Sequence, residues 1–345
     1  MSKAITAVDL GYMYTKGIIN GKPIIIKSVV GVGKDRKLKE FNKSVADSFA
    51  VDKKHDDIEY RDAHGIHFVS DLAITQSRIV KHSLTSDRFD SEVTKILLGT
   101  ILGLGMNGGA KETNFVSGLP VSHFDEYKEA IKSLFMDSKH EYNIESSGIR
   151  VNGSVKGRKG LFVPQPFGAL MDRILDDKGE IADTNLAKSR VAVVDIGFGT
   201  TDIYVCEVFN NIEQLTTSFS VAMNSVNQVV SDNILDHTGV NFPLYKAEHV
   251  VQSRVLKSGT KVYDMAPTIE WAYENVAYDI TNRLHNFWKD EIQFLDKIIF
   301  AGGGGASLYP HMKDHFPNTE LSQNGQLAVA RGYNKWGVRN LIRGV

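Results

Sequence analysis

The chain of 345 residues is 42% hydrophobic and 23% charged and has no low-complexity tract, which excludes an intrinsically disordered protein and favours two domains of ordinary size. Its 40 basic and 41 acidic residues leave a formal net charge of −1, so no strong field attracts it to DNA or to an acidic membrane, and any nucleic acid is expected to be reached through a partner. No stretch approaches the roughly 20 apolar residues that span a bilayer, and the N-terminus lacks the apolar segment of a signal peptide, so we expect a soluble, cytoplasmic protein.

The first predicted elements form a unit that recurs later in the chain. A strand at residues 5–8 ends at Asp9, the turn L-G-Y-M-Y-T follows, and strands at 16–19 and 23–26 flank an Asn20-Gly21 turn. This order predicts a meander of three strands that opens the first domain.

The segment between the two units mixes polar and apolar stretches. Residues 31–86 are polar and irregular, which predicts a solvated insertion of short strands and loops without a motif. The expected elements that follow are a helix at 91–104, a strand at 114–117 running into G-L-P, a helix at 125–136, and paired strands within 149–162 that turn at Asn152-Gly153 and Lys156-Gly157. Residues 163–170 are expected to cross between the domains.

The second unit begins 186 residues after the first. A strand at residues 191–194 ends at Asp195, the turn I-G-F-G-T-T follows, and strands at 202–208 and 212–219 flank Asn210-Asn211. Cys206, the only cysteine, lies in an apolar–polar alternation typical of a buried hydrophobic residue in a reducing compartment. Two related units, each with an acidic residue at a strand end, predict two related domains with the chemistry in the cleft between them.

The remaining elements are mainly helical. Helices are predicted at 224–238, stopped by Gly239, at 246–256 and at 268–289, where an apolar stripe at helical spacing indicates core. A buried strand at 297–301 enters the run G-G-G-G, which opens a helix at about Ala306, and a last helix at 326–342 is expected to pack back on the first domain.

Three glycine-bearing turns each follow a buried strand: residues 9–16, 195–202 and 298–307. Glycine lacks the Cβ that keeps backbone N–H groups away from phosphate oxygens, and a helix N-terminus favours anions. Lys16 adds a positive charge in the first turn. Each turn alone is a weak signal, but three in this order predict one polyphosphate site.

Two strand-end aspartates suit a magnesium ion. Mg²⁺ keeps most of its waters and is held by one or two carboxylates together with phosphate, so Asp9 and Asp195 are predicted to bind it through waters. Rossmann and Walker sites require G-x-G-x-x-G and G-x-x-x-x-G-K-[ST], and neither motif occurs here. His311 and His315 lack a third ligand and indicate an exposed helix, and a metal site at His64 and His67 is not expected.

The three turns resemble the phosphate 1, phosphate 2 and adenosine motifs of the superfamily of actin, sugar kinases and heat-shock chaperone ATPases, over nearly the whole chain. V-P-Q-P-F-G-A-L at 163–170, N-F-V-S-G-L-P at 114–120 and A-R-G-Y-N-K-W-G at 330–337 resemble the ParM/StbA plasmid-segregation branch. The resemblance implies an α/β, ribonuclease H-like fold in which a mixed five-stranded sheet flanked by helices is duplicated around a nucleotide cleft. It implies domains at 1–163 and 164–325, with residues 326–345 on the first.

The resemblance also implies roles for individual residues. Gln165 falls where family members position the attacking water, and with Asp9 and Asp195 it forms the expected catalytic set; a linker glutamine without a catalytic role is the alternative. The implied nucleotide-binding residues are Gly11, Tyr12, Met13, Tyr14 and Lys16, then Gly197, Phe198, Gly199, Thr200 and Thr201, then Gly302, Gly303, Gly304 and Ser307. Tyr12 and Met13 stand where actin has small residues, and Phe198 stands where many relatives have a small or acidic one, which affects side-chain contacts and not backbone ones.

Two functions remain open from the sequence. The first is a Mg²⁺-dependent ATPase, or GTPase, that polymerises into helical filaments and moves plasmid DNA through an adaptor bound to a centromere-like site, with no direct contact to nucleic acid or membrane. The second is a small-molecule kinase or phosphatase of the same superfold, which usually needs an acidic base where this chain has Gln165.

Overall fold

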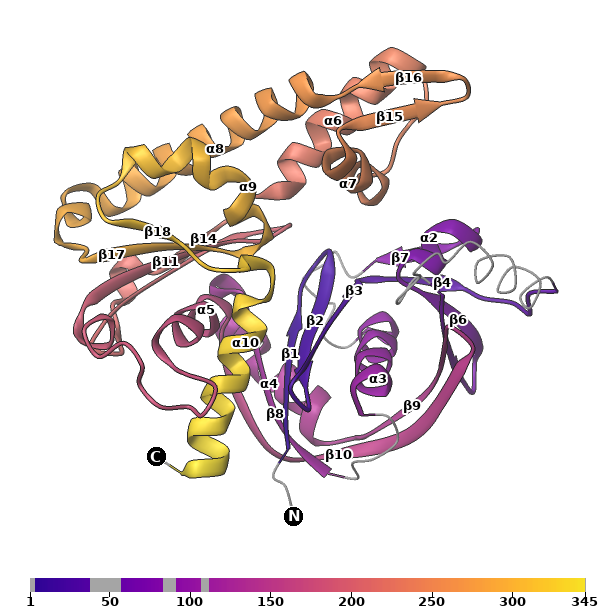
Figure 1. Cartoon of the computed structure of the whole chain (residues 1–345), viewed down its shortest axis with the longest axis horizontal. Helices are drawn as coiled ribbons and strands as arrows, with labels where there is room; N and C mark the ends of the chain where they lie inside the picture. Colours follow the sequence, from indigo (N-terminus) through magenta and orange to yellow (C-terminus); the bar gives the residue numbers. More distant parts are fainter. Residues whose placement is uncertain (1–3, 38–56, 83–90, 107–111, 345) are drawn as a thin grey trace.

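The computed structural model describes residues 4–37, 57–82, 91–106 and 112–344, in which two large β-sheets have a pair of helices between them (Figure 1). No helix in these described ranges is long and apolar enough to cross a membrane. Helices lie on both sides of the second sheet, while the first sheet curls around a helix of its own (Figure 1).

The first sheet has ten strands. In spatial order they are β3 (Lys22–Lys27), β2 (Tyr14–Ile19), β1 (Ile5–Leu10), β8 (Glu112–Leu119), β10 (Ile149–Pro164), β9 (Lys139–Ser146), β5 (Ile58–Asp62), β6 (Gly65–Val69), β4 (Val29–Val32) and β7 (Val80–His82). The sheet wraps around α3 (Glu92–Met106), which is buried on nearly all sides, and α4 (Phe124–Met136) packs on β10 from outside (Figure 1). Five strands, β3 to β10, form the unit expected from the sequence, and the others extend it.

The second sheet repeats that unit. Its strands are β13 (Asn210–Asn211) and β14 (Thr217–Phe219), which both pair with β12 (Thr201–Glu207), followed by β11 (Arg190–Ile196), β17 (Lys297–Ala301) and β18 (Thr319–Leu321). One face is covered by α6 (Met223–Thr238), α7 (Leu244–Ser253), α8 (Ala266–Trp288) and α9 (Gly302–Met312). The hairpin of β15 (Val255–Ser258) and β16 (Lys261–Asp264) projects beside α7 (Figure 1).

Two helices fill the space between the sheets. These are α5 (Gln165–Ile174) and α10 (Gly325–Gly337), which continues as a π-helical turn at Val338–Arg343. The helices can cross closely because Gly332 has no side chain. A Cβ at this position would lie 1.6 Å from the Gly168 carbonyl oxygen. Cys206 is buried in this same apolar cluster, as its alternation predicted.

Most elements expected from the sequence are present within one or two residues. The first unit, the first two strands of the second unit, the helices near 91–104, 125–136, 224–238 and 268–289, and the return of the last helix against β1, β2 and β8 are confirmed. The turn expected at Asn210-Asn211 was wrong, because these residues pair with β12 and the chain turns at Val208 and Phe209. The helix expected at 246–256 ends at Ser253, because Val255 begins the β15–β16 hairpin. How the chain divides at 163 and 164 stays a prediction.

Four further expectations about local structure were wrong, and the first concerns residues 149–162. They form one strand that pairs with β9 up to Lys156 and with β8 from Lys156 onward, with a bulge between Gly157 and Lys159, so one neighbour after the other satisfies its backbone. The glycines expected to turn the chain instead make room for neighbours: a Cβ on Gly153 would lie 2.6 Å from the Tyr142 hydroxyl oxygen, and one on Gly157 would lie 2.7 Å from the Phe135 carbonyl oxygen.

The other three concern segments whose packing is long-range. The part of 31–86 that is described extends the first sheet, includes α2 (Asp71–Gln76) and buries Phe68 and Val69, so it is not a solvated insertion; residues 38–56 and 83–86 lie outside the described residues. The strand expected at 212–219 is interrupted by a 3₁₀ turn, where the Leu215 carbonyl accepts a hydrogen bond from the Trp288 indole. α9 begins at Gly302 and not at Ala306, so the glycine run is its first turn.

Candidate functional site

The two related turns share one backbone structure. In the first, the Gly11 amide donates to the Tyr14 carbonyl at 3.1 Å; in the second, the Gly197 amide donates to the Thr200 carbonyl at 2.9 Å. These residues are again 186 positions apart. The repeat read from the sequence is therefore a repeat of hydrogen-bonding geometry, at the same edge of each sheet.

The residues opposite the two aspartates differ. On the antiparallel ladders, Asp9 pairs with Lys16, whereas Asp195 pairs with Asp202. One aspartate thus faces a cation and the other faces an anion, although the backbone around them is the same.

Around Asp9 the charges are compensated. Lys16 Nζ lies 2.8 Å from Asp9 Oδ2, and Gln165 Nε2 donates to Asp9 Oδ1 at 2.9 Å. Asp9 and Gln165 are buried. Burial alone would lower the pKa of Lys16, but the charge and hydrogen bond of Asp9, with a further contribution from Asp195, more than offset burial and leave that pKa raised. Gln165 owes its position to Pro164, which ends β10 and starts α5.

Around Asp195 the charges are not compensated. Burial raises the pKa of its carboxyl group to about 7; Lys16 opposes this, while the charges of Asp202 and Asp9 add to it. A buried carboxylate with a raised pKa favours protonation or the binding of a cation, because either one neutralises its charge.

Asp202 joins the two domains. Its buried carboxylate accepts hydrogen bonds from the Val121 amide at 2.8 Å, from Thr200 Oγ1 at 2.6 Å and from Ser218 Oγ. Val121 starts a 3₁₀ turn just after β8 of the first sheet, and the next amide, Ser122, donates to Ser218 Oγ at 3.0 Å. Burial raises the pKa of Asp202, and these three hydrogen bonds lower it in part.

The third glycine turn brings the N-terminus of α9 next to Asp195. Gly302 has φ +80°, and a Cβ there would lie 2.5 Å from Asp195 Oδ1, so only glycine fits. A Cβ on Gly304 would lie 2.6 Å from Met223 Cγ, whereas one on Gly303 would meet nothing within 4 Å. The helix start therefore faces open space at Gly303, where a ligand can approach the backbone.

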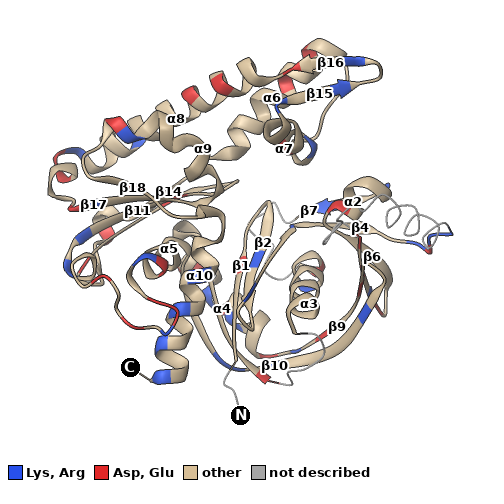
Figure 2. Cartoon of the chain, in the orientation of Figure 1, with Lys and Arg blue, Asp and Glu red and all other residues tan. Residues whose placement is uncertain are grey.

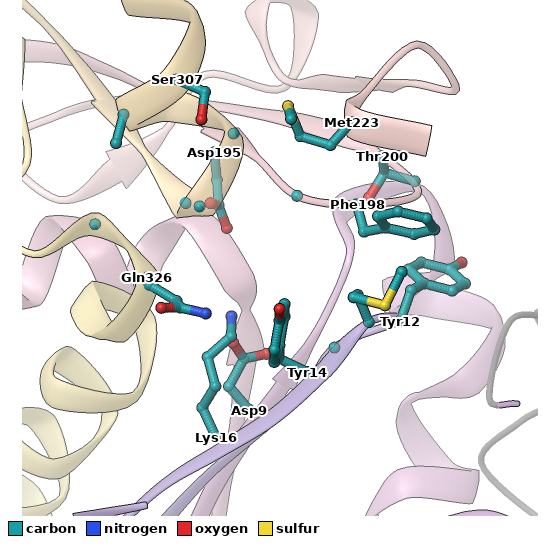
Figure 3. A pocket seen from close by; sticks show the side chains of 18 of the residues that line it. Asp9, Tyr12, Tyr14, Lys16, Asp195, Phe198, Thr200, Met223, Ser307 and Gln326 are labelled. Carbon is teal, nitrogen blue, oxygen red and sulfur yellow. The ribbon is translucent and has the colours of Figure 1, made fainter. Parts of the chain in front are cut away.

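These three turns line one cavity of about 360 Å³, a size typical of small-ligand sites. Figure 3 shows Asp195 on one side of it, with Asp9 and Lys16 on the other. All predicted site residues line the cavity except Gly199 and Thr201. Thr201 is buried and donates to the Val221 carbonyl, and Gly199 lies against the Tyr12 ring, which a Cβ would approach to 2.8 Å. The Tyr12 ring of the first turn thus packs against Gly199 of the second turn.

Ten further residues that line the cavity were not predicted from the sequence. They are Asp202, Met223, Glu248, Val251, Gln252, Tyr273, Ala306, Asn324, Gly325 and Gln326. Glu248 and Gln252 lie one turn apart on α7, and Gln252 Nε2 donates to Glu248 at 2.9 Å and to the Tyr14 hydroxyl at 3.0 Å across the cleft. Their spacing of four residues on one predicted helix face was the available signal, but it does not reveal which cavity that face meets.

The charges of the cavity select its ligand. Of its lining residues in the described chain, Asp9, Asp195, Asp202 and Glu248 are acidic and Lys16 is basic. A polyphosphate alone would add like charge to this set, whereas a divalent cation between the phosphates and the carboxylates would offset part of that repulsion. Asp195, buried without a compensating partner of its own, is the carboxylate that fits such a cation.

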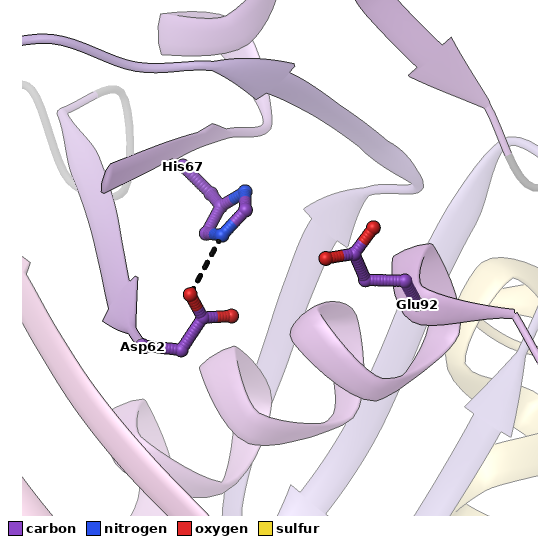
Figure 4. Close-up of side chains that lie close together, drawn as sticks. All are labelled: Asp62, His67 and Glu92. Atoms are coloured by element: carbon purple, nitrogen blue, oxygen red, sulfur yellow. Dashed lines mark hydrogen bonds and ion pairs between the residues drawn. The ribbon is translucent and has the colours of Figure 1, made fainter. Parts of the chain in front are cut away.

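A second group of potential metal ligands lies away from the cavity, at the curled part of the first sheet. Asp62, His67 and Glu92 offer ligand atoms within 4.8 Å of one another (Figure 4). His67 Nε2 lies 3.0 Å from Asp62 Oδ1, and Lys81 Nζ lies 3.7 Å from Glu92 Oε2. These pairings account for the group without an ion, so we assign it no metal site.

Comparison with known proteins identifies both halves of the chain. The family model for the N-terminal domain of actin-like proteins matches residues 7–168, and the model for the C-terminal domain of archaeal MreB-like actin homologues matches residues 193–314. No curated protein is significantly similar in sequence.

Solved structures share the fold over almost the whole chain. A 15-stranded ParM filament from Clostridium botulinum has a TM-score of 0.81 at 24% identity, covering 98% of this chain and 99% of that one. Ta0583, an archaeal actin homologue in complex with ADP, has a TM-score of 0.76 at 18% identity, covering 97% and 99%. At these identities the likeness establishes the fold of two domains around a cleft.

Proposed function

The chain belongs to the actin-like proteins, and from this premise we propose that it is a Mg²⁺-dependent ATPase of the ParM type that polymerises into filaments and segregates plasmid DNA in the cytoplasm through an adaptor protein. The observation that carries the proposal is the cavity itself. Two copies of one glycine turn and a glycine-rich helix start converge on it, and they bring Asp9, Lys16 and Gln165 opposite Asp195.

The geometry suits a nucleoside triphosphate held by backbone groups. The phosphates would lie between the Gly11 and Gly197 turns, near Lys16, and Gly303 leaves open space at the start of α9. Glu248, Gln252 and Tyr273 from α7 and α8 then line the part of the cavity left for the nucleoside. The bound ADP of the archaeal homologue supports a nucleotide as ligand; ATP is our choice over GTP by family resemblance.

A magnesium ion fits the carboxylates of the cavity. Asp195 and Asp9 would hold it through waters, and the ion would supply charge neutralisation for the phosphates. The chain's own contribution is to keep Asp9 fixed between Lys16 and Gln165 and to leave Asp195 without a compensating partner.

Gln165 is placed to orient the attacking water. Its Nε2 donates to Asp9, which fixes the amide plane and leaves Oε1 as an acceptor for a water proton. An amide is too weak a base to take that proton, so its contribution is to position the water for in-line attack. A linker role alone would not require the side chain to be buried against Asp9 in the cavity.

Assembly is the remaining part of the proposal. The filament of the Clostridium botulinum ParM, which has the same fold, supports self-association, and a head-to-tail contact that does not close produces a filament. Adaptor and plasmid DNA come from family resemblance, and the near-neutral charge agrees with a partner, not this chain, contacting the DNA.

Right-angle light scattering with Mg²⁺ and ATP, against ADP and no nucleotide, with electron microscopy of the same samples, tests the proposal. We expect scattering to rise only with ATP, and Gln165→Ala to assemble while hydrolysing ATP about 100-fold more slowly. Gln228→Ala, an exposed glutamine on α6 that does not line the cavity, is the control and should retain near-normal hydrolysis. Flat scattering with retained ATP binding would favour the small-molecule kinase or phosphatase.

A further inference from the structure

A buried hydroxyl group near the cavity takes no part in the mechanism described so far. Tyr333, on α10, is fully buried, and its Oη has no hydrogen-bond partner among the residues that the structure describes. Tyr333 does not line the cavity. A buried polar group without a partner lowers stability, and few such groups occur in folded proteins, so this hydroxyl calls for an explanation.

The Tyr333 side chain is held in place by glycines on two other elements. A Cβ on Gly168 of α5 would lie 2.7 Å from Tyr333 Cε1, and a Cβ on Gly118 of β8 would lie 2.2 Å from Tyr333 Oη. The helix α10 is itself fixed to α5, because Lys335 Nζ lies 2.9 Å from Asp172 Oδ1; Figure 2 shows basic residues on α10 beside α5. The hydroxyl group therefore occupies the place that a side chain at position 118 would take.

Position 118 lies beside Asp9 on the same face of the first sheet. β1 and β8 pair in parallel with Ala7 opposite Val116, so two residues further along Gly118 lies next to Asp9. Side chains alternate between the two faces of a strand, so Asp9 shares the face of Ala7, and Gly118 shares that of Val116. Ala7 and Val116 both pack in the apolar cluster that contains Tyr333. The Tyr333 hydroxyl thus lies on the face from which the Asp9 side chain projects.

The charges of the site act on this hydroxyl. Burial raises the pKa of Tyr333 well above its usual value, and the negative charges of Asp9, Asp195 and Asp202 raise it further, with Asp9 the strongest of the three. A phenol that stays protonated can donate a hydrogen bond, and a carboxylate is a strong acceptor for it. Tyr333 is therefore a donor without an acceptor, placed beside a carboxylate.

Asp9 has room for this donor. Its carboxylate accepts from Gln165 on Oδ1 and contacts Lys16 on Oδ2, and a carboxylate has roughly four acceptor positions. Lys16 Nζ also lies at the first glycine turn, 3.9 Å from where a Cβ on Gly11 would be. Phosphate oxygens at that turn would compete with Asp9 for the positive charge of Lys16, and Asp9 would then need another donor to stay fixed.

We propose that Tyr333 is a positioning residue for hydrolysis. When Lys16 turns toward the phosphates, the Tyr333 hydroxyl donates to the Asp9 carboxylate, and Asp9 continues to hold Gln165 in place. The hydroxyl lowers stability without nucleotide because its acceptor becomes free only when the site is occupied. The inference rests on the proposed function, since it names a residue that acts on the same site.

Tyr333→Phe removes the hydroxyl alone and separates the two states. Without nucleotide, the variant should melt at the wild-type temperature or up to about 2 °C above it, because the group without a partner is gone. With Mg²⁺ and ATP, its kcat should nevertheless fall about tenfold or more with little change in KM, because Gln165 is less well held. Tyr309→Phe is the matched control: its hydroxyl contacts Thr319 Oγ1 at 3.2 Å outside the cavity, so it should melt lower and hydrolyse ATP normally.

Carbon NMR of ζ-labelled tyrosine gives a readout that does not depend on turnover. The Tyr333 signal, assigned by its loss in Tyr333→Phe, should shift when Mg²⁺ and a non-hydrolysable ATP analogue are added, whereas the Tyr309 signal should not. If the analogue does not raise the melting temperature of wild-type protein, the proposed function fails and the role of Tyr333 with it. If it does, then an unshifted Tyr333 signal, a wild-type kcat in Tyr333→Phe, or a lower melting temperature of that variant without nucleotide would mean that only the role of Tyr333 is wrong.

Discussion

The two glycine turns of the cleft have the same backbone and opposite electrostatics. Asp9 lies across its ladder from Lys16 and is held by that cation and by Gln165, whereas Asp195 lies across from Asp202 and has a pKa raised to about 7. The hydrogen bonds that shape the two turns are the same; burial is the main cause of the raised pKa of Asp195, and the cross-strand charge of Asp202 adds to it.

We therefore expect the two turns to have different roles. The first is charge-balanced without ligand, which suits a group that fixes Gln165. The second stores an electrostatic cost that a bound cation would relieve, which favours binding of nucleotide together with its metal. Four substitutions test this contrast, and they follow in order of expected effect.

Removing the charge of Asp195 should produce the largest change. Between the unfolded pKa near 3.8 and the folded value of about 7 the native state binds the extra proton, so wild-type stability without ligand should fall as pH rises through this window. Asp195→Asn lacks this dependence, and its stability relative to wild type should rise by on the order of 3–4 kcal/mol from pH 4 to pH 8. Urea unfolding across that range measures it, and parallel curves for the two proteins would contradict it.

Breaking the ion pair between Lys16 and Asp9 should have the second largest effect. Lys16→Met leaves Asp9 buried with only the Gln165 hydrogen bond, and should lower the free energy of unfolding by about 3 kcal/mol. The matched control is Lys27→Met, whose partner Asp71 keeps 37% of its side chain exposed against 4% for Asp9, with an expected cost below about 1 kcal/mol. Equal effects in the two variants, measured by chemical denaturation at pH 7, would mean that the Asp9 pair has no special role.

Neutralising Asp202, the residue opposite Asp195, should lower the pKa of Asp195. Asp202→Asn keeps an oxygen for the Val121 amide but removes the negative charge, so the pKa of Asp195 should fall below 7. Carbon NMR titration of the aspartate carboxyl groups reports this directly. A pKa of Asp195 that stays unchanged would show that burial alone accounts for it.

Loosening the contact between the domains should have the smallest effect. Ser218→Ala removes the hydroxyl that donates to Asp202 and accepts from the Ser122 amide, and should cost about 1 kcal/mol. Hydrogen exchange of the Val121 and Ser122 amides should become faster than in Ser225→Ala, whose hydroxyl contacts its neighbour on the same helix. Unchanged exchange at both amides would argue against this link between the domains.

The sequence determined the features that depend on neighbours in the chain. The strand ends, the glycine turns and the repeat spacing are local, because a turn forms from four residues and alternation marks a strand, so Asp9, Lys16, Asp195 and the α9 start could be placed at one cleft. Asp202 ends the predicted second turn, but neither its place in the cavity nor its hydrogen bond from the Val121 amide follows from that turn.

Only the tertiary structure decided what depends on distant pairing. β10 continues through both predicted turns, with a bulge between Gly157 and Lys159, because β9 and then β8 pair along its length. α7 and α8 present Glu248, Gln252 and Tyr273 to the cavity only because the helices cover the second sheet. Likewise, an Asn-Asn pair at 210 and 211 suggested the turn, but the ladder of β12 and β13 placed it at Val208 and Phe209, against local preference. Packing and strand register are set by contacts between residues far apart in sequence, and these override local propensity wherever the two disagree.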